Sequence, residues 1–252
     1  MVVLRHDVDR LPKNSLLTAQ MENRLGIKGT YYFRIVPESY DEKIMEKIAR
    51  LGHEIGYHYE DMDLVARLRR LRGTMENGKW KMEDGKWEMG DGKGESKGYN
   101  FEDELIDLAY ESFCRNLEKM RQNFDIKTIC MHGSPRSKYD NKLIWKKYNY
   151  RELGIIGEPY FDIDWNQFGY LTDTGRRWNG ERVSVRDKVD SKFKLRFKST
   201  HDVIAGADQL PPKLMITIHP QRWTNQPLLW LREVIAQNVK NVVKAYVVRS
   251  SG

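Results

Sequence analysis

Short apolar runs alternate along this chain with segments whose apolar residues recur at helical intervals. A run rich in β-branched and aromatic residues predicts a strand, and apolar residues three and four positions apart predict a helix. The predicted strands cover residues 1–9, 26–35, 53–58, 126–131, 170–178, 214–218 and 242–248. The predicted helices cover residues 14–24, 40–51, 100–123, 143–148 and 227–239, and a short helix should begin at a Ser199 or Thr200 cap. This alternation is typical of parallel strands joined by crossover helices, so we expect an α/β fold.

Residues 73–98 interrupt the alternation with a seven-residue repeat. One copy begins at Met75, a second at Met82 and a decayed third at Met89. Each copy carries an Asn-Gly or Asp-Gly pair, which is a strong turn signal. We expect small hairpins or a flexible loop, inserted into a single domain of residues 1–252. The repeated tryptophans either hold such a hairpin together or contact a sugar.

Histidine or aspartate stands at the end of one predicted strand after another. In parallel α/β sheets, the edge formed by the C-terminal ends of the strands is where ligands bind. Two carboxylates that share a face of one strand repel each other unless a metal, a shared proton or a cation lies between them. We therefore expect a functional site at this edge, built from Asp7, Asp9, His58, His132 and His219.

The composition narrows the classes of partner. The chain has 252 residues and a formal net charge of +7, but its Lys and Arg residues are dispersed. Because no basic run is interleaved with aromatic residues, we expect no nucleic-acid partner. There is no apolar leader and no run of eighteen apolar residues, which predicts a cytoplasmic protein without a membrane partner. The two cysteines, Cys114 and Cys130, are better interpreted as thiols in a reducing compartment than as one disulfide.

Taken together, the motifs resemble those of the polysaccharide deacetylases, the NodB-homology or carbohydrate esterase family 4 group. The resemblance covers nearly the whole chain outside the repeat, and Gly-His-Glu-Ile-Gly-Tyr-His at 52–58 is its most specific part. Ser-Pro-Arg at 134–136 is similar to a further motif only loosely. The other matching segments are the Asp7 and Asp9 pair and residues 26–33, 161–165 and 216–219. The resemblance implies a distorted (β/α) barrel of about seven parallel strands.

Carried over by position, the resemblance implies a role for each of four residues. Asp7 would be the general base and His219 the general acid, while Asp9 and His58 would be metal ligands. The family places another histidine ligand four residues after His58, where this chain has Met62. A thioether is a poor ligand for zinc, so another group has to complete the site. We favour His132, which also stands at a strand end; Glu60, Asp61 and Asp63 are the alternatives.

Several further residues have two possible roles each, one at the substrate site and one structural. Arg34 either binds an anionic substrate group or neutralises the carboxylates. Asp164 and Trp165 either support the catalytic groups at the substrate site or form a strand-end turn, and Trp223 either walls the pocket or belongs to the core. The remaining histidines are interpreted structurally: His6 as a residue behind the site, His53 as a core residue and His201 as part of a helix cap.

The chemistry of these groups suits hydrolysis of an amide. A divalent metal, with zinc as the first choice, lowers the pKa of a bound water to about 7 and polarises a carbonyl. Asp7 would accept the proton of that water and His219 would protonate the departing amine. We expect a hydrolase of an acetamide bond, acting on an N-acetylated amino sugar. The alternatives are an amidase for a small cytosolic amide and a non-catalytic relative that binds a sugar or a metal; the oligomeric state is left open.

Overall fold

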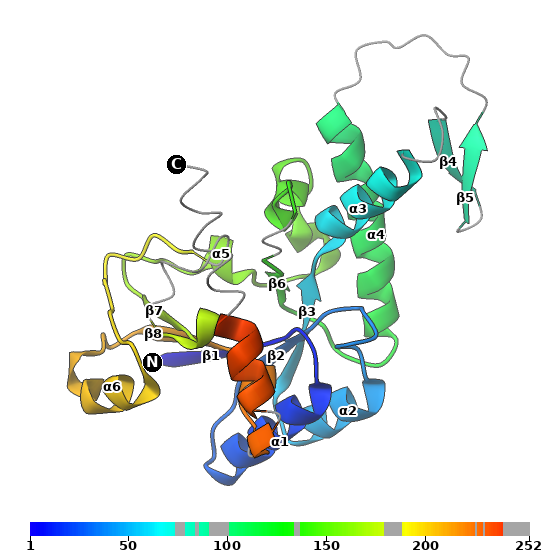
Figure 1. The fold of residues 1–252 in the computed structure, drawn as a ribbon. Coiled ribbons are helices and arrows are strands. Elements are labelled where there is room, and N and C mark those ends of the chain that lie inside the picture. Colours follow the sequence, from blue (N-terminus) through cyan, green and yellow to red (C-terminus); the bar gives the residue numbers. More distant parts are fainter. Residues whose placement is uncertain are drawn as a thin grey trace.

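A six-stranded parallel sheet lies at the centre of the described part of the chain. The computed structural model describes residues 1–73, 79–83, 86–90, 101–133, 137–178, 188–224, 226–228 and 230–238. Six strands pair in the order β6-β3-β2-β1-β8-β7, and every ladder between them is parallel (Figure 1). Their bounds are β1 Val2–Val8, β2 Thr30–Phe33, β3 Glu54–Tyr59, β6 Ile129–Met131, β7 Gly169–Thr172 and β8 Leu214–Ile218.

The strand order is that of a barrel rather than of a doubly wound sheet. The first and last described strands are neighbours, with Val3 paired to Met215, and the others follow the chain order around the sheet. A doubly wound sheet instead reverses its order at a switch point. Next to β6, an isolated parallel bridge joins Thr128 to Gly157, so the segment at Gly157 continues the sheet beyond its sixth strand. Among the described residues no ladder connects that segment to β7, so the barrel stays open there and the predicted distorted (β/α) barrel is confirmed.

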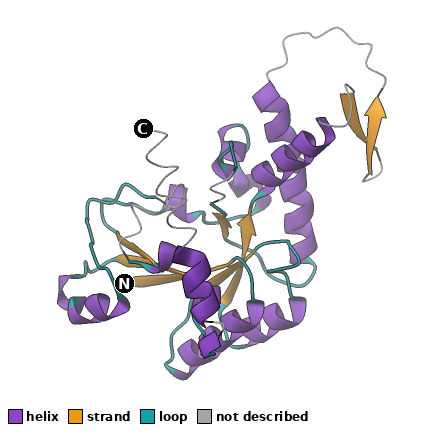
Figure 2. Ribbon diagram, in the orientation of Figure 1, coloured by secondary structure: helices purple, strands orange, loops and turns teal. Residues whose placement is uncertain are grey.

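Four helices pack against the first half of the sheet. They are α1 Pro12–Arg24, α2 Glu42–Arg50, α3 Asp61–Gly73 and α4 Phe101–Arg121. The helical spacing in α4 places Leu105, Ala109 and Phe113 on one buried face, as the sequence predicts. Figure 2 shows these helices flanking the strands, and the larger apolar core lies between them and β1, β2, β3 and β6.

Helix α3 has no counterpart among the helices predicted from the sequence. The helix begins at Asp61, directly after β3. Acidic side chains at Asp61 and Asp63 lie in its first turn, where they interact favourably with the helix dipole. Asp61 is buried and accepts hydrogen bonds from Tyr57 and Ser112, so a polar sequence at this point forms ordered structure.

The repeat insertion contains one antiparallel hairpin between α3 and α4. It consists of β4 Lys79–Glu83 and β5 Lys86–Gly90, and Figure 1 shows it away from the parallel sheet. The register pairs Glu83 with Lys86, so two residues connect the strands, as the turn signal predicts. The third copy of the repeat begins at Met89 within β5, and its remainder, from residue 91 on, lies outside the described residues.

The second half of the chain is less regular. Ser199 caps α6 in a capping box with Asp202, which confirms the predicted cap. The predicted helix at 143–148 is a 3-10 helix, and residues 227–228 and 230–238 are helical within the predicted closing helix. The predicted strand at 242–248 and the segment 134–136 lie outside the described residues. The remaining elements are α5 Pro159–Asp162, α6 Thr200–Ala205 and the 3-10 helices η1 Asn141–Lys146, η2 Tyr150–Leu153, η3 Thr174–Arg176, η5 Ala207–Gln209 and η6 Pro220–Arg222.

Two further expectations concern cysteines and membranes. Cys130 is buried and Cys114 is partly buried, and both are thiols, which excludes the disulfide alternative. In the part of the chain that the structure describes, no helix has the length and apolar character needed to cross a membrane.

Candidate active site

The predicted site residues gather where the strands of the parallel sheet end. Asp7 is the second-last residue of β1 and Asp9 directly follows the strand, while His58 is the second-last residue of β3. His132 comes directly after β6, and His219 directly after β8. Because all these strands are parallel, their C-terminal ends meet at one edge of the sheet.

Asp9, His58 and His132 converge on one point. Their ligand atoms all lie within 4.8 Å of one another. The Oδ1 atom of Asp9 is 3.6 Å from Nε2 of His58 and 3.5 Å from Nε2 of His132. This oxygen is buried and has no hydrogen-bond partner, whereas Oδ2 accepts a hydrogen bond from Gln221. An orphaned carboxylate oxygen between two imidazole nitrogens fits a divalent metal, which takes both kinds of ligand.

The far nitrogens of both histidines are held so that the near ones face this point. Nδ1 of His58 lies 2.9 Å from the carbonyl oxygen of Cys130, and a carbonyl only accepts, so we assign the proton to Nδ1 and the lone pair to Nε2. Nδ1 of His132 lies 3.1 Å from Oε2 of Glu60, outside hydrogen-bonding geometry, and the negative charge of Glu60 at this distance favours a proton on the same nitrogen. Metal-binding histidines usually have such a partner on the second nitrogen.

The charges around this point favour the ionised carboxylates. Burial raises the pKa of Asp9, but the imidazoles of His58 and His132 outweigh burial and hold that pKa well below its usual value. Burial likewise raises the pKa of Glu60, yet His132 and Arg34 lower it to about 2. Both carboxylates are therefore ionised, Asp9 at the point where the two Nε2 atoms meet and Glu60 on the far side of the His132 ring.

Asp7 lies beside this point but is held by an arginine that the sequence analysis did not single out. Arg5 donates from Nε to Oδ1 of Asp7 at 2.7 Å and from Nη2 to Oδ2 at 2.6 Å, and both residues are buried. Oδ2 is also 3.8 Å from Nε2 of His58. The period of two along a strand, which puts residues 5 and 7 on one face, is the signal that would have identified Arg5.

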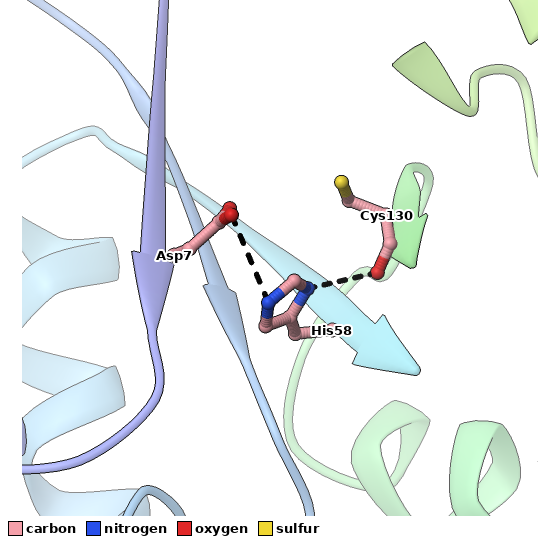
Figure 3. Close-up of side chains that lie close together, drawn as sticks. All are labelled: Asp7, His58 and Cys130. Carbon is pink, nitrogen blue, oxygen red and sulfur yellow. Dashed lines mark hydrogen bonds and ion pairs between the residues drawn. The ribbon is translucent and has the colours of Figure 1, made fainter. Parts of the chain in front are cut away.

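Cys130 is a second group that the sequence analysis did not use. Figure 3 shows its thiol on the same side as Asp7 and His58, and these three also form a cluster within ligand distance. The guanidinium of Arg5 occupies both oxygens of Asp7 and places a positive charge next to that cluster. Asp9, with its orphaned oxygen, is therefore the better carboxylate ligand.

His219 pairs with Asp173, the residue that follows β7. Nδ1 of His219 lies 2.5 Å from Oδ1 of Asp173, and the Asp173 carboxylate also accepts hydrogen bonds from Arg222 Nη1 and Trp223 Nε1. Burial and Arg222 lower the pKa of His219, but Asp173 outweighs them and raises it above the usual value. Sequence reasoning missed Asp173, because the predicted strand at 170–178 runs past it, whereas β7 ends at Thr172.

Comparisons with known proteins give similarity to solved structures only. No protein-family model matches the sequence, and no curated protein matches it. A CE4 family pseudoenzyme from Bacillus anthracis has a TM-score of 0.42 and 12% identity, over 95% of this chain and 61% of that chain. A mutant of this pseudoenzyme with restored enzymatic activity has a TM-score of 0.42 and 12% identity, over 95% of this chain and 63% of that chain. The Xyl-CE4 domain of a multidomain xylanase from the hindgut metagenome of Trinervitermes trinervoides has a TM-score of 0.40 and 14% identity, over 95% of this chain and 82% of that chain.

The chain is similar to CE4 structures. These are structures of the family that the sequence motifs resemble, although the chain spans less than two thirds of the length of the pseudoenzyme chains. At such identities and TM-scores, the similarity carries no information about the activity of this chain. Its chemistry has to be argued from the geometry of its own residues.

Arg34 and Trp223 lie at the site, each with partners of its own. Arg34 forms a forked ion pair with Glu60 and donates to the backbone oxygen of Asp9, so it neutralises the carboxylates, which was one of its two readings. Trp223 binds Asp173 through its indole nitrogen while 40% of its surface stays exposed. Trp223 therefore lies beside the His219–Asp173 pair with part of its indole open to solvent.

The structure does not bring Asp164 and Trp165 to this site. Both precede β7, whereas the site is formed by residues at the ends of the strands. Asp164 is exposed and accepts hydrogen bonds from Asn166 and Gln167, which is the strand-end turn that the sequence left open. The turn accounts for Asp164, and a contact of these two residues with substrate stays a prediction.

The remaining predicted residues also lie away from the site. His6 points to the other face of β1, where its Nε2 is 2.8 Å from Glu22 of α1. His53 is buried and contacts the carbonyl oxygen of Ala19. His201 is exposed in the first turn of α6. Met62 is fully buried in the apolar core, so its position on α3 does not face the ligand atoms.

Proposed function

We propose that this chain is a metal-dependent hydrolase of a carbon–nitrogen bond that removes acetyl from an N-acetylated amino sugar. The observation that carries the proposal is the orphaned Oδ1 of Asp9 between the Nε2 atoms of His58 and His132. Buried polar atoms in proteins nearly always have a partner, and a metal ion supplies one here. Asp9, His58 and His132 are the residues that would hold it.

The metal of first choice is zinc, because two imidazoles and one carboxylate make a zinc donor set with a position left for water or substrate. When bound, the metal polarises the amide carbonyl and makes a water more acidic. The protein residues supply the remaining steps. Each of these steps needs a group at a defined place beside the three ligands.

Asp7 is placed to act as the general base. Its Oδ2 lies 3.8 Å from the His58 nitrogen that faces the ligand point, so it borders the space where a water would attack. Arg5 donates one hydrogen bond to each carboxylate oxygen, and such a two-point contact fixes the orientation in which Asp7 accepts a proton. This orientation would persist through the reaction because the pair is buried.

His219 is placed to act as the general acid. Its Nδ1 is engaged by Asp173, so Nε2 is the nitrogen that donates a proton to the departing amine. The raised pKa of His219 keeps a larger fraction of it protonated near neutral pH. His219 and Asp9 follow the neighbouring parallel strands β8 and β1, and Gln221, two residues after His219, donates to Asp9, which places the acid beside the ligands.

Trp223 gives the proposal its substrate class. A partly exposed indole that is fixed at its nitrogen presents a flat apolar face beside the acid, and sugar rings pack on such faces. The non-catalytic alternative was favoured by Met62. Met62 lies in the core, and Asp9, His58 and His132 form a three-residue cluster without it, which supports a complete site in the proposed enzyme.

The first experiment measures tightly bound zinc, nickel, cobalt and manganese in the purified chain and in Asp9→Ala, His58→Ala and His132→Ala. Near-stoichiometric metal in the wild type, lost from all three variants, is expected. His201→Ala is the matched control, because that histidine is exposed in α6 and should leave the metal content unchanged. Release of acetate from N-acetylglucosamine oligomers by the metal-loaded protein then tests the reaction. A wild type that takes up no metal after reconstitution would overturn the proposal.

A further inference from the structure

Arg34 connects the ends of three neighbouring strands. It directly follows β2, donates from Nη1 to the backbone oxygen of Asp9 beyond β1 at 3.1 Å, and binds Glu60 beyond β3. The ion pair with Glu60 is forked, with Nε at 3.0 Å and Nη2 at 2.7 Å from Oε1, and Nη2 at 2.8 Å from Oε2. Such forks fix geometry as well as contribute energy.

Glu60 extends this connection to a fourth strand end. Its Oε2 lies 3.1 Å from Nδ1 of His132, which follows β6. The opposite nitrogen of the same ring, Nε2, is the one that lies 3.5 Å from Oδ1 of Asp9. Glu60 therefore acts on the histidine ring from the side away from the ligand point, and Arg34 fixes Glu60.

The two histidines differ in what orients them. The ring of His58 is held by a backbone carbonyl, that of Cys130, which belongs to the sheet itself. The backbone of His132 is held by Tyr59 and by Asn141, but its Nδ1 faces a side chain, that of Glu60. Since a side chain moves more easily than a sheet carbonyl, the direction of the His132 ring depends on what holds Glu60. Arg34 makes the shorter contacts to that carboxylate, and Arg67 lies 3.7 Å from its Oε2.

We infer that Arg34 and Glu60 are positioning residues for the ligand histidine His132, and that Arg34 serves metal binding rather than substrate binding. This inference rests on the metal site of the proposed function. Loss of a group that orients a metal-binding histidine typically weakens metal affinity about 10–100-fold. If Arg34 instead contacted the substrate, its loss would raise the Michaelis constant and leave zinc affinity unchanged.

The test measures zinc affinity by competition with a chromophoric chelator for the wild type, Arg34→Met, Arg34→Lys and Glu60→Gln. Arg34→Met and Glu60→Gln are expected to weaken zinc binding about 10–100-fold. Arg34→Lys should lie between, because an ammonium keeps the charge but cannot form the fork and reach Asp9 together. Arg50→Met is the matched control, since Arg50 is exposed, pairs with Glu46 on α2 and should bind zinc as the wild type does.

Two additional measurements distinguish a role in orienting His132 from a general loss of structure. Combining Arg34→Met with Glu60→Gln should weaken binding less than the product of the single effects, because both act through His132. The visible absorption of bound cobalt should change in both variants, since the coordination changes. If Arg34→Met does not fold, Arg34→Lys and Glu60→Gln carry the test.

Unchanged zinc affinity in folded Arg34→Met, with a raised KM for the acetylated substrate, would overturn the inference and return Arg34 to the substrate. Equal losses in Arg34→Met and Arg50→Met would overturn it too. A wild type that binds no zinc is a different result, because it removes the proposed function itself.

Discussion

The Nδ1 atom of His219 lies 2.5 Å from Oδ1 of Asp173, and this contact joins the ends of β8 and β7. The carboxylate also accepts from the backbone nitrogen of His219, at 3.2 and 3.1 Å, so the pair is fixed by main chain as well as side chain. Both residues are buried. A histidine paired in this way stays protonated to a higher pH than a free one.

Asp173→Asn is therefore expected to lower the pKa of His219. A general acid works only while protonated, so activity falls as the pH rises through this pKa, and in the variant it should fall at a lower pH. The ring protons of His219, assigned with His219→Gln, report the same shift by NMR titration. Asp164→Asn is the control, because Asp164 is exposed and lies before β7. Coinciding titration curves for wild type and Asp173→Asn would contradict this account.

The buried pair of Arg5 and Asp7 should be sensitive to the loss of either partner. Removing one partner leaves an uncompensated buried charge, which costs about 3–5 kcal/mol. Arg5→Met and Asp7→Asn should each lower the free energy of unfolding in urea, whereas the double variant should lose less than the sum. Additive losses would show that the pair does not act as a unit.

The sequence predicts a residue of this site only where a local pattern, such as the end of an apolar run, marks its position. Asp9, His58 and His132 were predicted because each stands at the end of an apolar run, and parallel strands bring such ends together. Asp173 follows β7 in the structure, but its partner His219 is 46 residues away and no local pattern marks the pair. Asp164 was chosen because Asp-x-Asp repeats the pattern of Asp7 and Asp9, although it precedes a strand.

The same limits apply to the fold. Helix α4 was predicted because its apolar residues recur at helical intervals, and the structure buries that face. Helix α3 was missed because its first turn is acidic. Its burial depends on Ser112 and Asn116 of α4, which bind Asp61 from a distant part of the chain. Tertiary partners of this kind cannot be inferred from local sequence.

Met62 provides a direct test of where the third ligand lies. Its side chain is fully buried in the core, away from the ligand atoms. Met62→His should therefore leave zinc affinity unchanged and lower the free energy of unfolding, because a buried polar group without a partner costs about 1–3 kcal/mol. Chelator competition and urea unfolding measure the two effects. Tighter zinc binding without loss of stability would place the third ligand on α3.

Asp61 predicts a pH dependence of stability that is separate from catalysis. Burial raises the pKa of its carboxyl from 3.8 to about 6, against hydrogen bonds from Tyr57, Ser112 and Asn116. A raised pKa in the folded state means that the stabilisation is fully present below pH 3.8 and is lost as the pH rises through 6. A shift of this size corresponds to about 3 kcal/mol.

The amide in Asp61→Asn does not titrate, and its oxygen still accepts hydrogen bonds from the α4 side. The difference in unfolding free energy between wild type and Asp61→Asn should therefore shift against the wild type by about 2 kcal/mol from pH 4 to pH 7. Ser112→Ala removes one donor to the charged form, raises the pKa of Asp61 further and should extend the loss to higher pH. Urea unfolding at several pH values measures all three proteins. Parallel stability curves for wild type and Asp61→Asn would mean that Asp61 ionises in the folded protein as readily as in the unfolded chain, and that its three donors fully offset its burial.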